Sequence, residues 1–291
     1  LYYSINQFGI VFASEIKALL EHPNVPRVIN YNALDCYLKV DYIPGERTIF
    51  KHIHKLLPAH YLIYNQGVTN VHKYWRLNFK YEDKPISFWL EELEDAILSS
   101  VKSRMIADVP IGTFLSGGID STIILTAMAK LSEQPVKAFS IGFEDSRNDE
   151  SQFIEYAVEK NHAQSYYHLI NQKLDFDLLR SLIYQADEPL ADGSLAPTYL
   201  VCKTGRRHAK VILSGDGGDE TFIGYRKYER FLNHELSRNK LSIPNIPGIY
   251  AIIKKLPLAK RTIMLRYLSE SSYRYAELTY GYFSKSFTDI Y

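Results

Sequence analysis

The residues best suited to chemistry form a short turn in which two glycines stand between hydroxyl and carboxylate side chains. Residues 116–121 read Ser-Gly-Gly-Ile-Asp-Ser and follow the apolar pair Phe114-Leu115. Adjacent glycines let backbone N–H groups converge on one point, and the helix expected after them adds its positive N-terminal end. The pattern favours binding of the pyrophosphate group of a nucleotide. An ordinary turn that caps a helix can contain the same residues.

A second turn, over residues 213–220, packs three glycines and three carboxylates into Leu-Ser-Gly-Asp-Gly-Gly-Asp-Glu. Clustered carboxylates repel one another unless a cation lies among them, and magnesium on a triphosphate is such a cation. A flexible acidic turn is the alternative. The turn over 116–121 has neither the P-loop nor the Gly-x-Gly-x-x-Gly spacing, so its pattern supports neither a Walker NTPase nor a Rossmann dehydrogenase.

An alternation of strands and helices would position both turns. After a helix over 88–104, the sequence predicts strands at 111–115, 136–142, 165–170 and 210–214, and helices at 121–130, 150–159, 176–185 and 197–206. This order predicts an α/β fold, a mostly parallel sheet with helices on both faces. Ligands of such sheets collect beyond the carboxyl ends of the strands, where the two turns and the loop over 142–149 would meet.

The segment before the sheet has a mixed pattern. It predicts a hairpin turning near Gly9, a helix over 14–20 with Ser14 as its N-cap, a helix over 32–40, and a second hairpin over 61–75. A polar stretch at 81–85 marks the expected boundary. We therefore expect three regions, residues 1–80, residues 81–235, and a helical extension over 236–291.

Composition narrows the class of partner. The 291 residues carry 34 basic and 33 acidic side chains, which gives a net charge of +1. A charge this balanced does not indicate binding to nucleic acid or to an anionic membrane. No apolar run approaches the ~20 residues of a membrane span. Cys36 and Cys202 show no metal or redox spacing. We expect a cytoplasmic protein with small-molecule partners, with a homodimer left open.

Taken with their flanking residues, the two turns resemble the synthetase half of glutamine-dependent asparagine synthetases, members of the ATP pyrophosphatase (PP-loop) superfamily. Residues 187–192, 197–200 and 224–225 extend this likeness to about Arg230, and residues 12–20, 48–50 and 57–61 resemble the end of that family's glutaminase domain and its connection, with Ala59 where glycine is common. The resemblance implies an adenine nucleotide alpha hydrolase-like PP-loop domain preceded by a partial α+β remnant of an N-terminal-nucleophile glutaminase domain.

The resemblance also implies roles for individual residues. The pyrophosphate loop would comprise Ser116, Gly117, Gly118, Asp120 and Ser121, and further ATP contacts would come from Leu115, Ile141, Ser214 and Gly215. Mg2+ would be held by Asp120 and Asp219. Asp216 would be the catalytic residue, standing where the family often has the longer glutamate.

The implied enzyme is an ATP-dependent amide-forming ligase. It would convert aspartate to asparagine through β-aspartyl-AMP, releasing pyrophosphate and taking ammonia from glutamine. Such chemistry needs aligned substrates and neutralised leaving-group charge rather than a covalent nucleophile. Two alternatives remain. One is a related PP-loop amidotransferase or β-lactam synthetase-like enzyme acting on another carboxylate, and the other is a nucleotide-binding module without catalysis.

The sequence is expected to be the middle of a longer enzyme. It begins at Leu1 without an initiator Met or a signal peptide, and it lacks the N-terminal cysteine that the family's glutaminases use. The family's Arg-Val-Pro motif is not found in residues 241–291.

Overall fold

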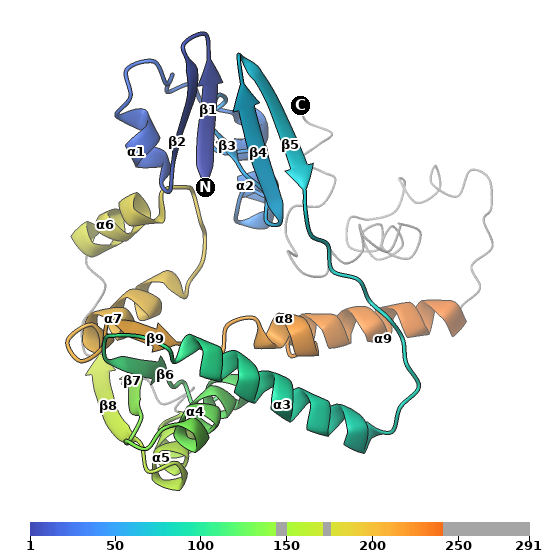
Figure 1. Ribbon diagram of the computed structural model, residues 1–291, viewed down its shortest axis with the longest axis vertical. Coiled ribbons are helices and arrows are strands. Elements are labelled where there is room, and N and C mark those ends of the chain that lie inside the picture. Colours follow the sequence, from blue (N-terminus) through green and yellow to red (C-terminus); the bar gives the residue numbers. More distant parts are fainter. Residues whose placement is uncertain (144–149, 171–175, 241–291) are drawn as a thin grey trace, which may run out of the picture. The chain divides into compact units, whose positions relative to one another are not determined.

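The computed structural model describes residues 1–143, 150–170 and 176–240 (Figure 1). It divides into two compact units, one formed by Leu1–Tyr37 with Asp41–Asp216 and the other by Leu38–Val40 with the chain from Gly217 onward. The boundaries expected near residues 80 and 235 stay predictions. Most of the loop expected over 142–149, and the expected extension beyond residue 240, lie outside the described residues.

A four-stranded parallel sheet organises the first unit. Its strands are β6 (Ile111–Phe114), β7 (Lys137–Phe143), β8 (Gln164–Ile170) and β9 (Val211–Leu213), in the order β8-β7-β6-β9. The chain steps outward from β6 to β7 and β8 and then returns to the other side of β6. The strand order therefore reverses between β6 and β9, and ligands of open α/β sheets bind at such a switch point.

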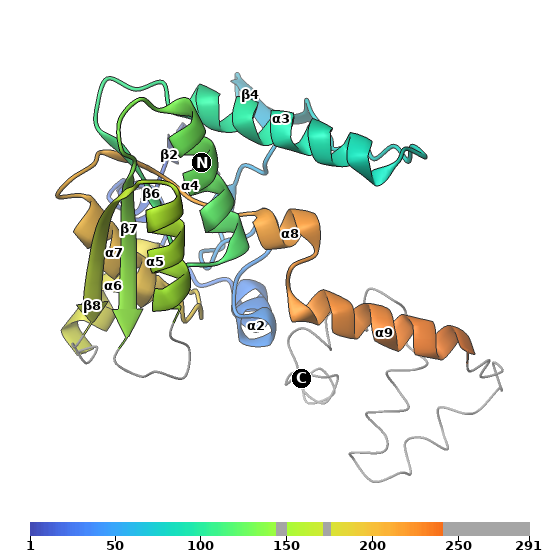
Figure 2. The ribbon, with the colours of Figure 1, turned by 90° about the horizontal axis from the view of Figure 1, so that it is seen from below.

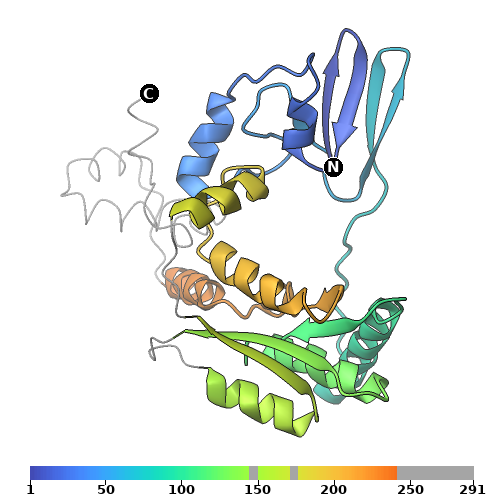
Figure 3. The same cartoon turned by 90° about the vertical axis from the view of Figure 1, so that its left-hand side faces the viewer.

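Helices cover both faces of this sheet, which confirms the predicted α/β class. Figures 2 and 3 show α4 (Ile119–Leu131) and α5 (Ser151–Lys160) along one face and α7 (Leu195–Gly205) on the other. Outside them, α3 (Ile86–Arg104) packs on α4, and α6 (Phe176–Ala186) packs on α7. The buried cluster under α3, α4 and α5 comprises Val101, Leu115, Leu125, Ala127, Met128, Val136, Ala138, Ile154, Ala157 and Leu213.

The chain before the sheet is built from hairpins and short helices. Strands β1 (Tyr2–Asn6) and β2 (Gly9–Ala13) form an antiparallel hairpin, which β3 (His54–Lys55) extends on the β1 side. A second hairpin pairs β4 (His60–Asn65) with β5 (Val68–Lys73). Between them lie α1 (Ile16–Leu20) and α2 (Tyr31–Val40), whose inner side chains form two small buried clusters.

The start of α1 differs from the prediction. Ser14 was expected to cap this helix, but the N-cap position falls on Glu15, whose side chain makes no capping bond. The carboxylate of Asp187, far along the chain, accepts hydrogen bonds from the N–H groups of Ile16 and Lys17 instead. The Ser14 prediction is wrong because local sequence cannot reveal a cap that another part of the fold supplies.

The second unit contains α8 (Gly218–Phe222) and α9 (Arg226–Lys240). Across the described ranges of both units, no helix has the length and apolar character that crossing a membrane requires.

Truncating a side chain on the buried face of α4 should destabilise the first unit. Leu125 is fully buried in the cluster between α4 and the sheet. We expect Leu125→Ala to lower the free energy of unfolding by about 2–5 kcal/mol, because the lost methyl groups leave a cavity. Ile119 on the same helix is 79% exposed, so Ile119→Ala should change it by less than about 0.5 kcal/mol. Urea unfolding followed by circular dichroism would compare them, and equal losses would contradict this packing.

Candidate functional site

The turn after β6 is held in shape by two serine hydroxyls. The Ser121 hydroxyl donates to the Gly118 carbonyl at 3.1 Å and accepts from the Ser116 N–H at 3.2 Å. The Ser116 hydroxyl lies 3.1 Å from that of Ser121 and accepts from the Gly118 N–H at 3.2 Å. Ser121 is buried, so its hydroxyl fastens the turn to the first turn of α4.

Glycine at 117 is a requirement of the geometry. Gly117 has a φ of +89°, a conformation that side chains disfavour, and a Cβ there would lie 3.1 Å from the Glu150 carbonyl oxygen. At the N-cap of α4, Gly118 offers no side chain to the first N–H groups of the helix. An uncapped helix N-terminus presents N–H donors and a positive dipole end, which together suit an anion.

The turn after β9 lies directly against the turn after β6. A Cβ on Gly215 would stand 2.8 Å from the backbone carbonyl carbon of Asp120 and 2.8 Å from the N atom of Ser121. Below this contact the two strands are tied by the Thr113 hydroxyl, which donates to the Leu213 carbonyl at 3.1 Å in a fully buried position. Both turns therefore meet at the switch point of the sheet.

A cavity of about 290 Å³ opens beside the turn after β6. Three predicted site residues, Leu115, Ser116 and Ile141, line it. Leu115 is anchored by its backbone, since its N–H donates to Phe139 and its carbonyl accepts from the Ser140 hydroxyl at 2.7 Å. The other wall residues include Gly142, Glu150, Ser151, Ile154, Tyr167, Pro197, Thr198 and Val201. The cavity thus runs from the ends of β6, β7 and β8 to α5 and α7.

Asp216, the predicted catalytic residue, is exposed and accepts a hydrogen bond from the Ser214 hydroxyl at 2.9 Å. Asp219, a predicted metal ligand, belongs to the second unit, in the first turn of α8 beside Glu220. The Glu220 carboxylate accepts from the Tyr225 hydroxyl at 2.9 Å. That hydrogen bond, with smaller effects of burial and nearby charge, raises the pKa of Tyr225 to about 12.

The donor set suits a magnesium ion that is shared with a substrate. Within the described ranges, no cluster of three or more histidine, cysteine, aspartate or glutamate side chains is arranged to hold a metal. Asp120, in the first turn of α4, offers carboxylate oxygens next to the uncapped N–H groups. Mg2+ typically takes one or two protein carboxylates and completes its shell with waters and phosphate oxygens. The assignment of Asp120 and Asp219 as the magnesium ligands stays a prediction.

The structure brings most of the predicted residues together around one sheet edge. Ser116, Gly117, Gly118 and Ser121 share one turn, and Gly215 packs on it. The cavity residues that the sequence missed include Glu150 and Ser151, which line the cavity from the start of α5. The only signal for Glu150 and Ser151 in the sequence was their position directly after the loop expected at 142–149. The carboxylates of Asp187 and Glu188 bond to residues near the start of the chain.

Two family models match the chain. Residues 92–286 match the model described as asparagine synthase, and residues 1–75 match the model described as a glutamine amidotransferase domain. The first match extends well past Arg230, where the motif-based resemblance was expected to end.

Several curated proteins are similar to most of the chain. The putative asparagine synthetase [glutamine-hydrolyzing] 2 of Methanocaldococcus jannaschii is 32% identical over 267 residues, 89% of this chain and 50% of that protein. Asparagine synthetase [glutamine-hydrolyzing] 1 of Bacillus subtilis is 32% identical over 265 residues, 91% of this chain and 40% of that protein. The amidase chyE of Penicillium rubens is 30% identical over 262 residues, with coverages of 81% and 37%. The chain therefore spans half or less of the length of these relatives.

Among solved structures, the NH3-dependent NAD synthetase of Campylobacter jejuni is similar with a TM-score of 0.30 and 14% identity, over 66% of this chain and 96% of that one. An overlap this low supports no argument about function.

A methyl group on Gly215 should separate the two turns. We expect Gly215→Ala to lower the free energy of unfolding by about 1–3 kcal/mol, because the backbone atoms it would strike cannot rotate away. Gly193 has open space around its Cα, so Gly193→Ala should be nearly neutral. Urea unfolding of both variants would measure the difference, and an unaffected Gly215→Ala would contradict the close contact.

The Tyr225–Glu220 hydrogen bond predicts a pH effect. Because the pKa of Tyr225 is raised to about 12, the folded protein holds the phenol proton more tightly than the unfolded chain. The bond should therefore stabilise the fold fully below about pH 10, the ordinary value for tyrosine, and that contribution should vanish as pH rises through about 12.

Replacing Glu220 by glutamine tests this assignment. We expect Glu220→Gln to lower the pKa of Tyr225 toward 10, measured by titrating its 13C NMR signal, assigned with Tyr225→Phe. Glu229→Gln, on α9, is the control and should leave the titration unchanged. A pKa that does not respond to Glu220→Gln would refute the hydrogen bond.

Proposed function

Because the chain belongs to the asparagine synthase family, we propose that it forms the ATP-using part of an amide-forming ligase that converts aspartate to asparagine. The observation that carries this proposal is the contact of Gly215 with the backbone of Asp120 and Ser121. It joins the two glycine-rich turns at the switch point of the parallel sheet, where open α/β folds bind nucleotides.

The adenosine part of ATP would bind in the cavity, and its phosphates would bind at the turns. The cavity, lined by Leu115, Ile141 and Tyr167, offers apolar walls and strand-end backbone to the adenosine part. Its volume of about 290 Å³ is at the low end for ligand sites, so the phosphates would extend out of it. The turn over Ser116–Ser121 and the uncapped N–H groups of α4 would then hold the pyrophosphate.

A carboxylate beside a phosphate site needs a cation. Asp120 adds negative charge at the helix end where the phosphates would bind, and without compensation it would repel them. Mg2+, held by Asp120 and Asp219, would neutralise the charge that develops on the leaving pyrophosphate. This requirement supports ATP·Mg2+ as the bound species.

The proposed reaction needs positioning rather than a covalent enzyme nucleophile. A β-carboxylate oxygen of aspartate attacks the α-phosphorus of ATP, and the bond to the bridging oxygen of pyrophosphate breaks. Ammonia then attacks the carbonyl carbon of the β-aspartyl-AMP, AMP leaves, and a proton passes to solvent. Asp216, held by the Ser214 hydroxyl, is the proposed carboxylate at the reacting centre.

The identity of the acceptor has a second candidate. Because a relative of similar identity is named an amidase and not an asparagine synthetase, the second candidate is a related enzyme that acts on a carboxylate other than that of free aspartate. In either case ammonia would come from glutamine, which the match of residues 1–75 to a glutamine amidotransferase domain supports. A non-catalytic nucleotide-binding module would bind ATP·Mg2+ and form no pyrophosphate.

The acceptor is tested by the substrate dependence of pyrophosphate release. In the complete natural protein with ATP, Mg2+ and ammonium, we expect aspartate to trigger pyrophosphate release and equal amounts of asparagine and AMP. A coupled pyrophosphate assay and chromatography would follow the products. Release that occurs only with another carboxylate would favour the second candidate, and ATP binding without any release would leave only a binding module.

The proposed metal ligands are tested by removing one charge at a time. We expect Asp120→Asn and, separately, Asp219→Asn to slow Mg2+-dependent pyrophosphate release by about a hundredfold or more, as the loss of several kcal/mol of charge stabilisation implies. Asp95→Asn, on the exposed side of α3, is the matched control and should retain the wild-type rate. Wild-type rates in both site variants would disprove this metal site.

A further inference from the structure

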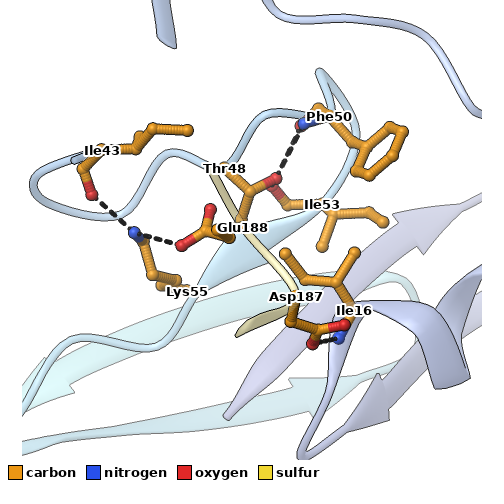
Figure 4. Close-up of polar contacts among 8 residues, drawn as sticks. All are labelled: Ile16, Ile43, Thr48, Phe50, Ile53, Lys55, Asp187 and Glu188. Carbon is orange, nitrogen blue, oxygen red and sulfur yellow. Dashed lines mark hydrogen bonds and ion pairs between the residues drawn. The ribbon is translucent and has the colours of Figure 1, made fainter. Parts of the chain in front are cut away.

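Asp187 ties the end of α6 to the start of α1. Its carboxylate accepts from the N–H group of Ile16 (Figure 4) and from that of Lys17 at 3.0 Å. The side chain of Asp187 is 9% exposed. The Lys17 ammonium lies 3.4 Å from the same carboxylate and 5.7 Å from the centre of the Tyr184 ring of α6. Asp187 therefore supplies the cap that Glu15 does not provide.

The next residue makes an independent connection. The Glu188 carboxylate lies 2.9 Å from the Lys55 ammonium, which also donates to the Ile43 carbonyl at 2.6 Å. Both charged side chains are largely buried, with exposures of 14% and 22%. The second carboxylate oxygen of Glu188 is buried without a hydrogen-bond partner among the described residues.

A third bond completes the attachment of residues 187–191. The Ala191 N–H donates to the Asp41 carbonyl at 2.9 Å. Every one of these partners lies within the first 55 residues, the part that matches the glutamine amidotransferase domain, whereas residues 187–191 lie within the asparagine synthase match. The 187–191 segment thus joins two parts of the chain that different family models cover.

The same segment leads directly into the wall of the cavity. A few residues after Ala191, α7 begins at Leu195, and its side chains Pro197, Thr198 and Val201 line the cavity. This helix packs on β7 and β8, so its position sets the width of the cavity. A displacement of the 187–191 segment would therefore move that wall.

We propose that Asp187 is a positioning residue that couples the amidotransferase-matched part of the chain to the cavity wall formed by α7, so that ammonia supply and carboxylate activation run in step. This inference rests on the proposed function. The buried Lys55–Glu188 pair supports it, since a buried ion pair adds little net stability over apolar packing but strongly penalises the loss of one partner. The attachment thus has one well-defined geometry.

The test uses the complete natural protein and three variants. Asp187→Asn keeps the shape of the side chain but presents an NH2 group to one of the two N–H donors. Glu188→Gln weakens the neighbouring connection and leaves the cap of α1 intact. Glu15→Gln is the matched control, because it removes a carboxylate at the same helix end that pairs with Lys17 at 3.0 Å but makes no capping bond.

The rate of amide hydrogen exchange tests the attachment of residues 187–191 independently of catalysis. With Asp187→Asn we expect the N–H groups of α1 to exchange about tenfold faster, the usual effect of losing a cap, and peptides over 191–201 to exchange several-fold faster. Glu188→Gln should accelerate 191–201 alone, and Glu15→Gln should change neither. Acceleration confined to α1 in Asp187→Asn would show that Asp187 is only a cap and would overturn the proposal.

Activity then tests the coupling itself. Asp187→Asn and Glu188→Gln should lower glutamine-driven pyrophosphate release several-fold relative to ammonia-driven release, and more glutamate should form per pyrophosphate. An unchanged ratio would overturn the coupling role. If the wild-type protein releases no pyrophosphate with any nitrogen source, the proposed function fails and the coupling role falls with it, while the exchange data still decide whether the attachment exists.

Discussion

The parallel pairing of β6 with β9 is the constraint on which the rest of the site depends. Because both strands run in the same direction, the turns that follow them must emerge at one edge of the sheet. The pairing is fastened in the core by the Thr113 hydroxyl, which donates to the Leu213 carbonyl. Gly215 then lets the second turn rest on the backbone of Asp120 and Ser121. Without this pairing, the two glycine-rich turns would be separate loops.

The sequence predicted the sheet well because its signals are local. Apolar runs separated by helical periodicity placed the four strands of the sheet and the helices α3 to α7 to within about two residues, and paired glycines marked the turns. The cap of α1 was not predictable, since Asp187 lies 171 residues from Ile16 and the pattern around Ser14 looked sufficient. Glu150 and Ser151 were missed for a related reason. They reach the cavity only through the packing of α5 on the sheet, which no spacing encodes.

Electrostatics explains why these turns combine glycine with acid. A carboxylate in the first turn of a helix is stabilised by the helix dipole, and α4 and α8 both place aspartate there. The same charge opposes an anionic ligand at the free N–H groups. On the proposed function, a divalent ion resolves the conflict, because it needs the carboxylates and the phosphate oxygens together. On this proposal, the acidic turns would select a phosphate group that arrives with its metal ion bound.

The attachment of residues 187–191 links the segment that leads into α7, a wall of the cavity, to the first 55 residues of the chain. Two of its three anchors are charged, and the orphaned oxygen of Glu188 carries a cost of desolvation that apolar packing would avoid. Apolar contacts tolerate sliding, whereas a capped helix end and a buried ion pair accept only narrow geometry. If the fold required only stable packing between residues 1–75 and the sheet, hydrophobic burial would contribute more stabilising free energy. The charged anchors therefore favour a fixed position of α7 over added stability. On the proposed function, coordinated delivery of ammonia to an activated carboxylate would require such a fixed position.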